Sequence, residues 1–181
     1  MFMFPPIPSW DAMHPLIVHF PIALLLVTPI LVIFGIVLPK QARGLFIAAL
    51  VVMALGTIAT YFAVATGEAA GELAERTPGA AAVLEQHEDL AETTRLIFTA
   101  LTVVFAAILF VPSIFKRTLN RKIAVAVNML FLLFYAGGAV FLMNVAHQGG
   151  RLVHEFGVRA SISSSQPAPA TKPAKPHDDD D

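Results

Sequence analysis

The chain of 181 residues contains no cysteine. Without thiols it has no disulfide, no thiolate zinc site, no iron–sulfur ligation and no Cys-x-x-Cys-His attachment for covalent haem. Charged residues are also scarce: they make up 14% of the chain, against roughly 25% in a typical soluble domain, whereas hydrophobic residues reach 56%. This composition excludes an ordinary soluble domain and favours a membrane protein.

Aspartate, glutamate, lysine and arginine are absent from four long hydrophobic runs, residues 15–38, 44–66, 96–115 and 123–146. At about 1.5 Å of rise per residue, each run is about 30–36 Å long as a helix, which is enough to cross the hydrocarbon core. Helices are expected because a bilayer offers no water to pair with backbone amides. The sequence therefore predicts an all-α membrane protein, with four transmembrane helices in an up-down-up-down bundle.

The segment before the first run lacks basic residues, unlike the start of a signal peptide, so the first run is expected to be retained. The two short links, residues 39–43 and 116–122, carry six of the 12 basic residues and no acidic residue. All 13 acidic residues lie on the other side. The positive-inside rule then puts both links in the cytoplasm. Both termini and the outer loop, residues 67–95, are predicted to face the periplasm of a bacterial inner membrane.

Two units are expected along the chain. Residues 1–159 form the transmembrane domain, and residues 160–181 form a disordered tail, because this segment is rich in Ser, Pro, Ala and Lys and has no apolar period. Within the outer loop, the sequence Thr77-Pro78-Gly79 signals a turn. Apolar residues recur every three to four positions from Ala80 onward, which predicts one helix over Ala80–Phe115 that projects beyond the membrane. In the first span, Pro21 is expected to kink the helix and re-aim the nearby His19.

All six histidines fall on the predicted outer side: His177 lies in the tail, and the other five are His14, His19, His87, His147 and His154. A single interfacial histidine is most often only a polar tip at the headgroup level. Five on one side instead favour a bound cofactor, because paired imidazoles from facing helices hold haem axially. By helix rise, His19 and His147 share a lower layer and form the preferred axial pair. His87 pairs with His14 or His154 in an upper layer. One haem b is expected rather than two, because the end of a bundle is too wet to hold both.

Other polar residues lie at heights that suit such a cofactor. Arg151, Arg95 and Arg76 are expected partners for the haem propionates. Asn144 and Thr94 are candidates to orient an imidazole nitrogen or a water molecule.

The histidines also carry a family resemblance. The segment His14-Pro15-Leu16-Ile17-Val18-His19-Phe20-Pro21-Ile22-Ala23-Leu24 resembles the signature of a bacterial family of small four-span membrane proteins, domain of unknown function 2231. Further matches, in the expected order, are Ala65-Thr66-Gly67, His87 and His147-x-Gly149-Gly150-Arg151-Leu152-Val153. The resemblance covers residues 12–158. It implies a four-helix membrane domain suspected of binding haem and sometimes found near cytochromes. Members usually carry an aromatic residue where His154 stands, so this histidine is either an added ligand or dispensable.

Three functions remain open. The first is a b-type cytochrome-like subunit that transfers electrons between the quinone pool and a periplasmic cytochrome or a larger respiratory complex; it is an electron-transfer subunit rather than a stand-alone enzyme. The second is a module that binds zinc, copper or iron through the imidazoles together with Glu88, Asp89 and Glu155. The third is a structural accessory subunit. Transport is disfavoured because no charged residue lies in mid-membrane. The expected partners are the lipid bilayer and a respiratory or cytochrome complex. No nucleic acid is expected.

Overall fold

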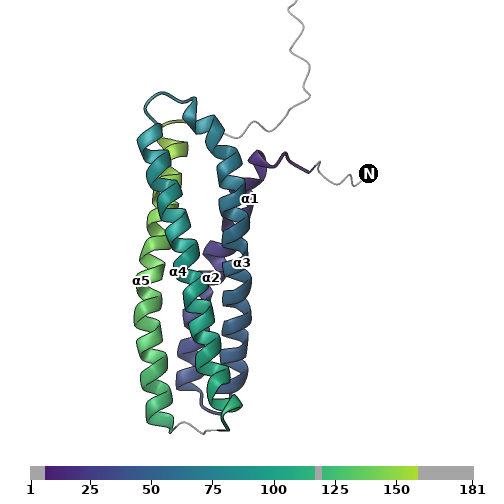
Figure 1. The fold of residues 1–181 in the computed structure, drawn as a ribbon, viewed down its shortest axis with the longest axis vertical. Coiled ribbons are helices and arrows are strands. Elements are labelled where there is room, and N and C mark those ends of the chain that lie inside the picture. The colour runs from purple at the N-terminus through teal and green to yellow at the C-terminus, as the bar shows by residue number, and fades with distance from the viewer. Residues whose placement is uncertain (1–6, 117–119, 159–181) are drawn as a thin grey trace, which may run out of the picture.

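The computed structural model describes residues 7–116 and 120–158, apart from the side chain of Leu73, so the predicted tail lies outside the described residues. The helical elements are η1 (Asp11–Met13), α1 (His14–Ile17), α2 (His19–Val37), α3 (Ala42–Glu75), α4 (Ala81–Ile114) and α5 (Arg121–His154). This described part contains no strand. The long helices lie side by side, with the α3–α4 connection at one end and the α2–α3 connection at the other (Figure 1).

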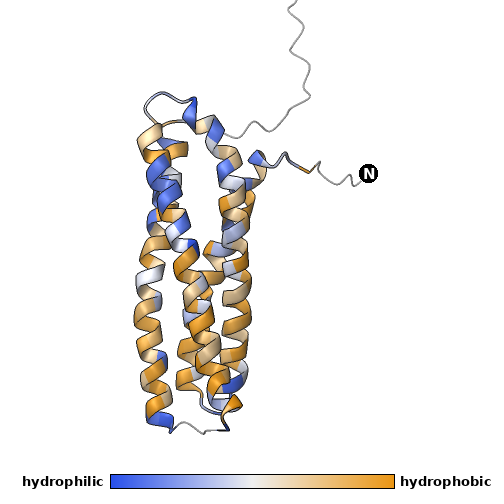
Figure 2. Ribbon diagram, in the orientation of Figure 1, coloured by the Kyte–Doolittle hydropathy of each residue, from blue (hydrophilic) through white to orange (hydrophobic). Residues whose placement is uncertain are grey.

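Four helical segments are long and apolar enough to cross a membrane: Asp11–Val37, Ala42–Glu72, Ala81–Ile114 and Arg121–His154. They cover the four predicted spans to within one residue at the ends of the first and third, so the expected all-helical fold with four membrane-crossing lengths is confirmed. Many large apolar side chains point outward, and Figure 2 shows hydrophobic colouring along most of the bundle, with polar residues gathered toward its ends. Such an apolar exterior is stable when lipid chains surround it.

The first helical segment is interrupted within residues 14–24, the segment that carries His14 and His19. α1 and α2 are separated at Val18, three residues before Pro21. A proline ring clashes with the carbonyl four residues earlier, here that of Ile17, and cannot donate to it. The break therefore lies one turn before the proline. It separates the helical turn that carries His14 from the helix that begins with His19.

The helices extend well beyond the apolar runs at the α3–α4 end. α3 continues to Glu75 and α4 begins at Ala81, so the expected outer loop, residues 67–95, is helical except for its middle, residues 76–80. Gly79 in this connection has φ +80°, which glycine adopts without steric cost. The helix predicted over Ala80–Phe115 is confirmed, with its ends at Ala81 and Ile114. α5 likewise continues to His154, past Gly149 and Gly150.

Two apolar clusters pack the interior. The larger one contains Phe98, Phe105, Phe131 and Tyr135, with Phe105 stacked on Phe131 at 4.7 Å between ring centroids. A smaller cluster closes the end of the bundle at the α3–α4 connection; its buried members are Ala74, Ala80, Val83, Leu84 and Leu152. His87 lies on α4 between the two clusters, after Leu84 of the smaller one and before Phe98 of the larger one.

Candidate functional site

His14 of α1 and His87 of α4 converge in the interior of the bundle. Their ring centroids are 6.3 Å apart and the ring planes are nearly perpendicular, at 89°. Both side chains are partly buried. In the described part of the chain, this is the only ring contact between two histidines.

Each of these imidazoles is held by a main-chain carbonyl of a neighbouring helix. Nδ1 of His14 lies 3.0 Å from the Ala63 carbonyl oxygen of α3, and Nδ1 of His87 lies 3.1 Å from the Val145 carbonyl oxygen of α5. A carbonyl oxygen only accepts hydrogen bonds, so Nδ1 is the donor in both cases. In the neutral form of each ring, Nε2 therefore carries a lone pair. No hydrogen bond of the described residues engages either Nε2.

A glycine follows each of these carbonyls by four residues. A Cβ atom at Gly67 would lie 3.0 Å from Cε1 of His14, and one at Gly149 would lie 3.1 Å from Cε1 of His87. In an α-helix the carbonyl of residue i already accepts from the N–H of residue i+4. The missing side chain at i+4 lets the imidazole come close enough to donate a second hydrogen bond. The same construction therefore holds both rings, once on α3 and once on α5.

Two cavities meet at this pair of imidazoles. The turn-side cavity, on the side of the α3–α4 connection, has a volume of about 440 Å³. Its lining includes the two histidines and the carboxylate residues Asp11, Glu68, Glu88, Asp89 and Glu92. The core-side cavity has a volume of about 420 Å³ and is lined mostly by apolar residues of all four long helices. Aspartate, glutamate, lysine and arginine are absent from its lining, so the two cavities differ sharply in charge.

The remaining predicted histidines are placed differently. His19 is exposed, and its Nδ1 lies 2.6 Å from the Pro15 carbonyl oxygen of the preceding turn. His154 is also exposed, and both His19 and His154 line the core-side cavity. His147 is exposed and lines neither cavity. The structure thus brings together His14 and His87 from the upper layer, whereas no described contact joins His19 to His147.

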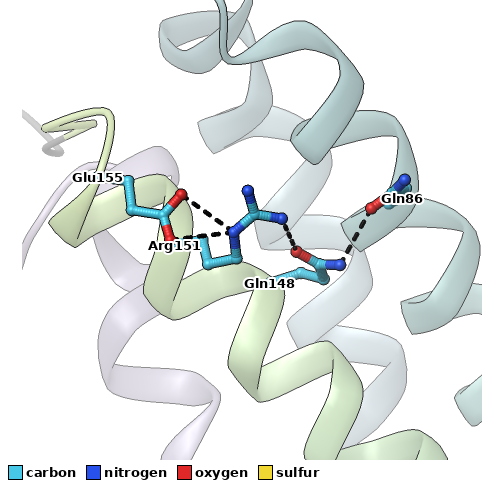
Figure 3. Close-up of polar contacts among 4 residues, drawn as sticks. All are labelled: Gln86, Gln148, Arg151 and Glu155. Atoms are coloured by element: carbon cyan, nitrogen blue, oxygen red, sulfur yellow. Dashed lines mark hydrogen bonds and ion pairs between the residues drawn. The ribbon is translucent and has the colours of Figure 1, made fainter.

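The arginines expected to bind propionates face other partners. Figure 3 shows Arg151 between Glu155, whose carboxylate oxygen is 3.0 Å away, and Gln148, which in turn reaches Gln86 of α4. The guanidinium of Arg95 lies 5.2 Å from the centre of the Tyr61 ring. Arg76, Arg95 and Arg151 are all absent from the lining of both cavities.

The polar residues expected to orient the imidazoles are also placed differently. Asn144 donates to the Val140 carbonyl of its own helix, and Thr94 lines the core-side cavity without touching a histidine nitrogen. The groups that do orient the rings are the carbonyls of Ala63 and Val145. The sequence contains one signal for them, since Gly67 and Gly149 stand in the segments that carry the family resemblance.

A conventional site for a metal ion is absent from residues 7–116 and 120–158: no three His, Cys, Asp or Glu side chains are close enough to hold one ion. Glu88 interacts electrostatically with Glu68, Glu75, Asp89 and Glu92. The arrangement that the described residues do offer is two imidazoles on different helices, with free Nε2 atoms and space on either side.

Four apolar helices of membrane-crossing length, with a pair of neighbouring histidines toward one end, define a small multi-span membrane protein. The chain belongs to the family described as "Predicted membrane protein (DUF2231)", whose match covers residues 11–161 and so agrees with the resemblance found over residues 12–158. No curated protein and no solved structure matches the chain.

Proposed function

We propose that this protein binds a b-type haem in the membrane, with Nε2 of His14 and Nε2 of His87 as the two axial ligands. The observation that carries the proposal is the pairing of these two imidazoles across the bundle, each held through Nδ1 by a backbone carbonyl. Ligating histidines characteristically donate their other ring N–H to a carbonyl or carboxylate, which orients the ring and leaves the ligating nitrogen free.

The number of available donors favours haem over a tetrahedral ion. A haem iron would need only the imidazoles of His14 and His87, whose ring centroids are 6.3 Å apart. A tetrahedral zinc site takes three or four protein donors. Among the described residues, no three His, Cys, Asp or Glu side chains lie close enough to hold one ion.

The space beside the pair suits a flat, largely apolar group. Each of the two cavities alone lies within the roughly 300–1,000 Å³ range of ligand pockets. Apolar residues that line both cavities next to the two imidazoles supply contacts for a porphyrin ring: Pro15, Val64, Ala91 and Val153. The carboxylates of the turn-side cavity favour a centre that carries positive charge, and net charge is one of the factors that tune the potential of an iron centre. We therefore propose a low reduction potential, because nearby negative charge stabilises the ferric state.

Bound haem would supply one-electron transfer. The chain's own residues hold the two ligands, exclude water on the core side and surround the turn side with negative charge. We propose that the protein passes electrons between the quinone pool and a periplasmic cytochrome or a larger respiratory complex. We place it in a bacterial inner membrane as an up-down-up-down bundle with both termini in the periplasm, because the two links on one side carry lysine and arginine without any acidic residue.

The test is optical. The protein, expressed with ample haem and purified in mild detergent, is expected to show sharp α and Soret bands of low-spin haem b on dithionite reduction, and a pyridine haemochrome assay is expected to give one haem per chain. His14→Ala and His87→Ala should each abolish the low-spin spectrum. His147→Ala is the matched control and should leave it intact, because this histidine lines neither cavity.

Other outcomes decide between the remaining functions. Spectra that survive in His14→Ala and His87→Ala but disappear in His19→Ala and His147→Ala would restore the lower-layer pair as the ligands. A colourless protein would eliminate the haem proposal. Elemental analysis for zinc, copper and iron then separates the metal-binding module from a structural accessory subunit.

A further inference from the structure

One buried hydroxyl group has no hydrogen-bond partner. Thr94 is only 3% exposed, and its Oγ1 atom is fully buried without a partner among the described residues. Threonine in a helix normally donates to a carbonyl one turn earlier. Five other threonines of this bundle do so, at 2.6–2.9 Å: Thr28, Thr60, Thr66, Thr99 and Thr102. Thr94 departs from a rule that its neighbours follow, and an unsatisfied buried hydroxyl is destabilising.

Thr94 lines the core-side cavity at its inner end. Thr94 is two helical turns beyond His87, about 10 Å further along α4. The residues around it in the lining are apolar side chains of other helices, including Ile22 of α2 and Leu142 of α5. Thr94 and His87 therefore stand two helical turns apart along the lining of this cavity.

The cavity reaches the surface between α2 and α5. His19, the first residue of α2, and His154, the last residue of α5, line it and are both exposed. Next to His19, Phe20 is 63% exposed, so the apolar outer surface of the bundle extends to the rim of the cavity. A molecule dissolved in the bilayer can thus enter at the rim, where the two imidazoles are the polar groups.

The lining specifies the chemistry of such a molecule. Because no Asp, Glu, Lys or Arg lines the cavity, the ligand is uncharged; a fatty acid or a phospholipid headgroup would find no cation there. The apolar walls fit a ring, and the polar groups stand at opposite ends, with Thr94 inside and imidazoles at the rim. A hydroxyl can donate to a carbonyl oxygen or accept from a hydroxyl. It therefore suits both redox forms of a quinone, whose ring carries an oxygen at each end.

We propose that the core-side cavity binds the headgroup of a lipid-soluble quinone, with one ring oxygen hydrogen-bonded to Oγ1 of Thr94 and the other facing the rim at His19 and His154. This site gives the quinone partner of the proposed electron transfer a location in the chain. It rests on the cavity and the hydroxyl, and it does not require haem to be bound.

The chain provides its own reporter for a binding experiment. Trp10 is the only tryptophan, and its Nε1 donates to the Ala65 carbonyl at 3.3 Å, on the helix that also carries the Ala63 carbonyl of the histidine site. Decylubiquinone is titrated into the protein in nanodiscs while the fluorescence of Trp10 is followed. Saturable quenching is expected for the unmodified chain. Thr94→Val, which keeps the shape and removes the hydroxyl, should raise the Kd about tenfold, the effect of one lost buried hydrogen bond.

Thr93→Val is the matched control, because Thr93 is the preceding residue and is exposed. Its Kd should equal that of the unmodified chain. Thermal unfolding without quinone guards against misfolding: Thr94→Val should be at least as stable as the unmodified chain, since it removes an unsatisfied hydroxyl. With decylubiquinone present, Thr94→Val should be stabilised less than the unmodified chain at the same quinone concentration. Quenching that does not saturate, or equal affinity in Thr94→Val and Thr93→Val, would overturn the proposal.

The haem content of every sample is measured in parallel, so that the two proposals fail separately. A colourless protein with saturable, Thr94-dependent quinone binding would support the quinone site and contradict the haem proposal. A low-spin haem spectrum without quinone binding would support the haem proposal and contradict the quinone site.

Discussion

Cε1 of His87 lies 3.1 Å from the position that a Cβ atom of residue 149 would occupy, so this ring has its place because residue 149 is glycine. The relationship of His14 to Gly67 is the same, at 3.0 Å. Contacts this short require the neighbour to move if a methyl group is added. Both rings depend on their present positions for the hydrogen bonds that leave Nε2 free.

Alanine at either glycine should therefore displace the imidazole. In Gly149→Ala, His87 should lose its hydrogen bond to the Val145 carbonyl, and in Gly67→Ala, His14 should lose its bond to the Ala63 carbonyl. The proportion of low-spin haem should fall in both variants. Nitrogen-15 NMR of the histidine rings gives a readout that needs no haem: the Nδ1–H tautomer should predominate at both sites in the unmodified chain and decline at the affected site.

Gly150→Ala is the control for this pair of substitutions. A Cβ atom there meets nothing within 4 Å, and the residue lies in the same helix as Gly149. Alanine in a helix is favoured over glycine by roughly 0.5–1 kcal/mol, so Gly150→Ala should be neutral or slightly stabilising. If Gly149→Ala behaves like Gly150→Ala in tautomer and spectrum, the ring does not need the glycine.

The orientation of the bundle can be tested with introduced cysteines, because the chain has none of its own. Gln41→Cys lies in the α2–α3 connection and Glu85→Cys near the start of α4, and both positions are exposed. A membrane-impermeant maleimide applied to intact spheroplasts should label Glu85→Cys at once. Gln41→Cys should react only after the membrane is permeabilised, because the basic links are expected in the cytoplasm. The reverse pattern, or equal labelling of both, would contradict the orientation.

The four membrane helices could be predicted from the sequence because apolar length alone determines them, and the helix from Ala80 followed from its periodicity. The histidine pairing could not be derived in the same way. The rise per residue predicts how far along the bundle axis each histidine lies, and it places His14 and His87 in the same upper layer. Which residues of a layer meet depends on the rotation of each helix about its axis. Here the break at Val18 changes that rotation between His14 and His19.

The orienting groups were harder still to foresee. The sequence favours Asn144 and Thr94 because polar side chains are visible in it. The actual partners are carbonyls, which every residue possesses, at Ala63 and Val145. Each of these two carbonyls has a glycine four residues later, which leaves room for the ring.

A buried hydrogen bond compensates for a proline in the larger apolar cluster. The hydroxyl of Tyr135 in α5 donates to the Leu25 carbonyl of α2 at 2.6 Å. In a regular helix that carbonyl would accept from residue 29, but residue 29 is proline, which has no N–H. Tyr135→Phe should therefore leave a buried carbonyl unpaired and lower the free energy of unfolding by about 1–3 kcal/mol. Unfolding by SDS in mixed micelles measures this loss. Tyr61→Phe is the control and should cost less, because Tyr61 is 45% exposed.

A double-mutant cycle isolates the cause. In a Pro29→Ala background, the backbone N–H at position 29 becomes available to the Leu25 carbonyl, so Tyr135→Phe should lose much of its effect. Residues that share a partner in this way typically show coupling of about 0.5–3 kcal/mol. An equal cost of Tyr135→Phe in both backgrounds would mean that the tyrosine stabilises the bundle through its ring contacts with Phe98 and Phe131 and not through the carbonyl that the proline leaves free.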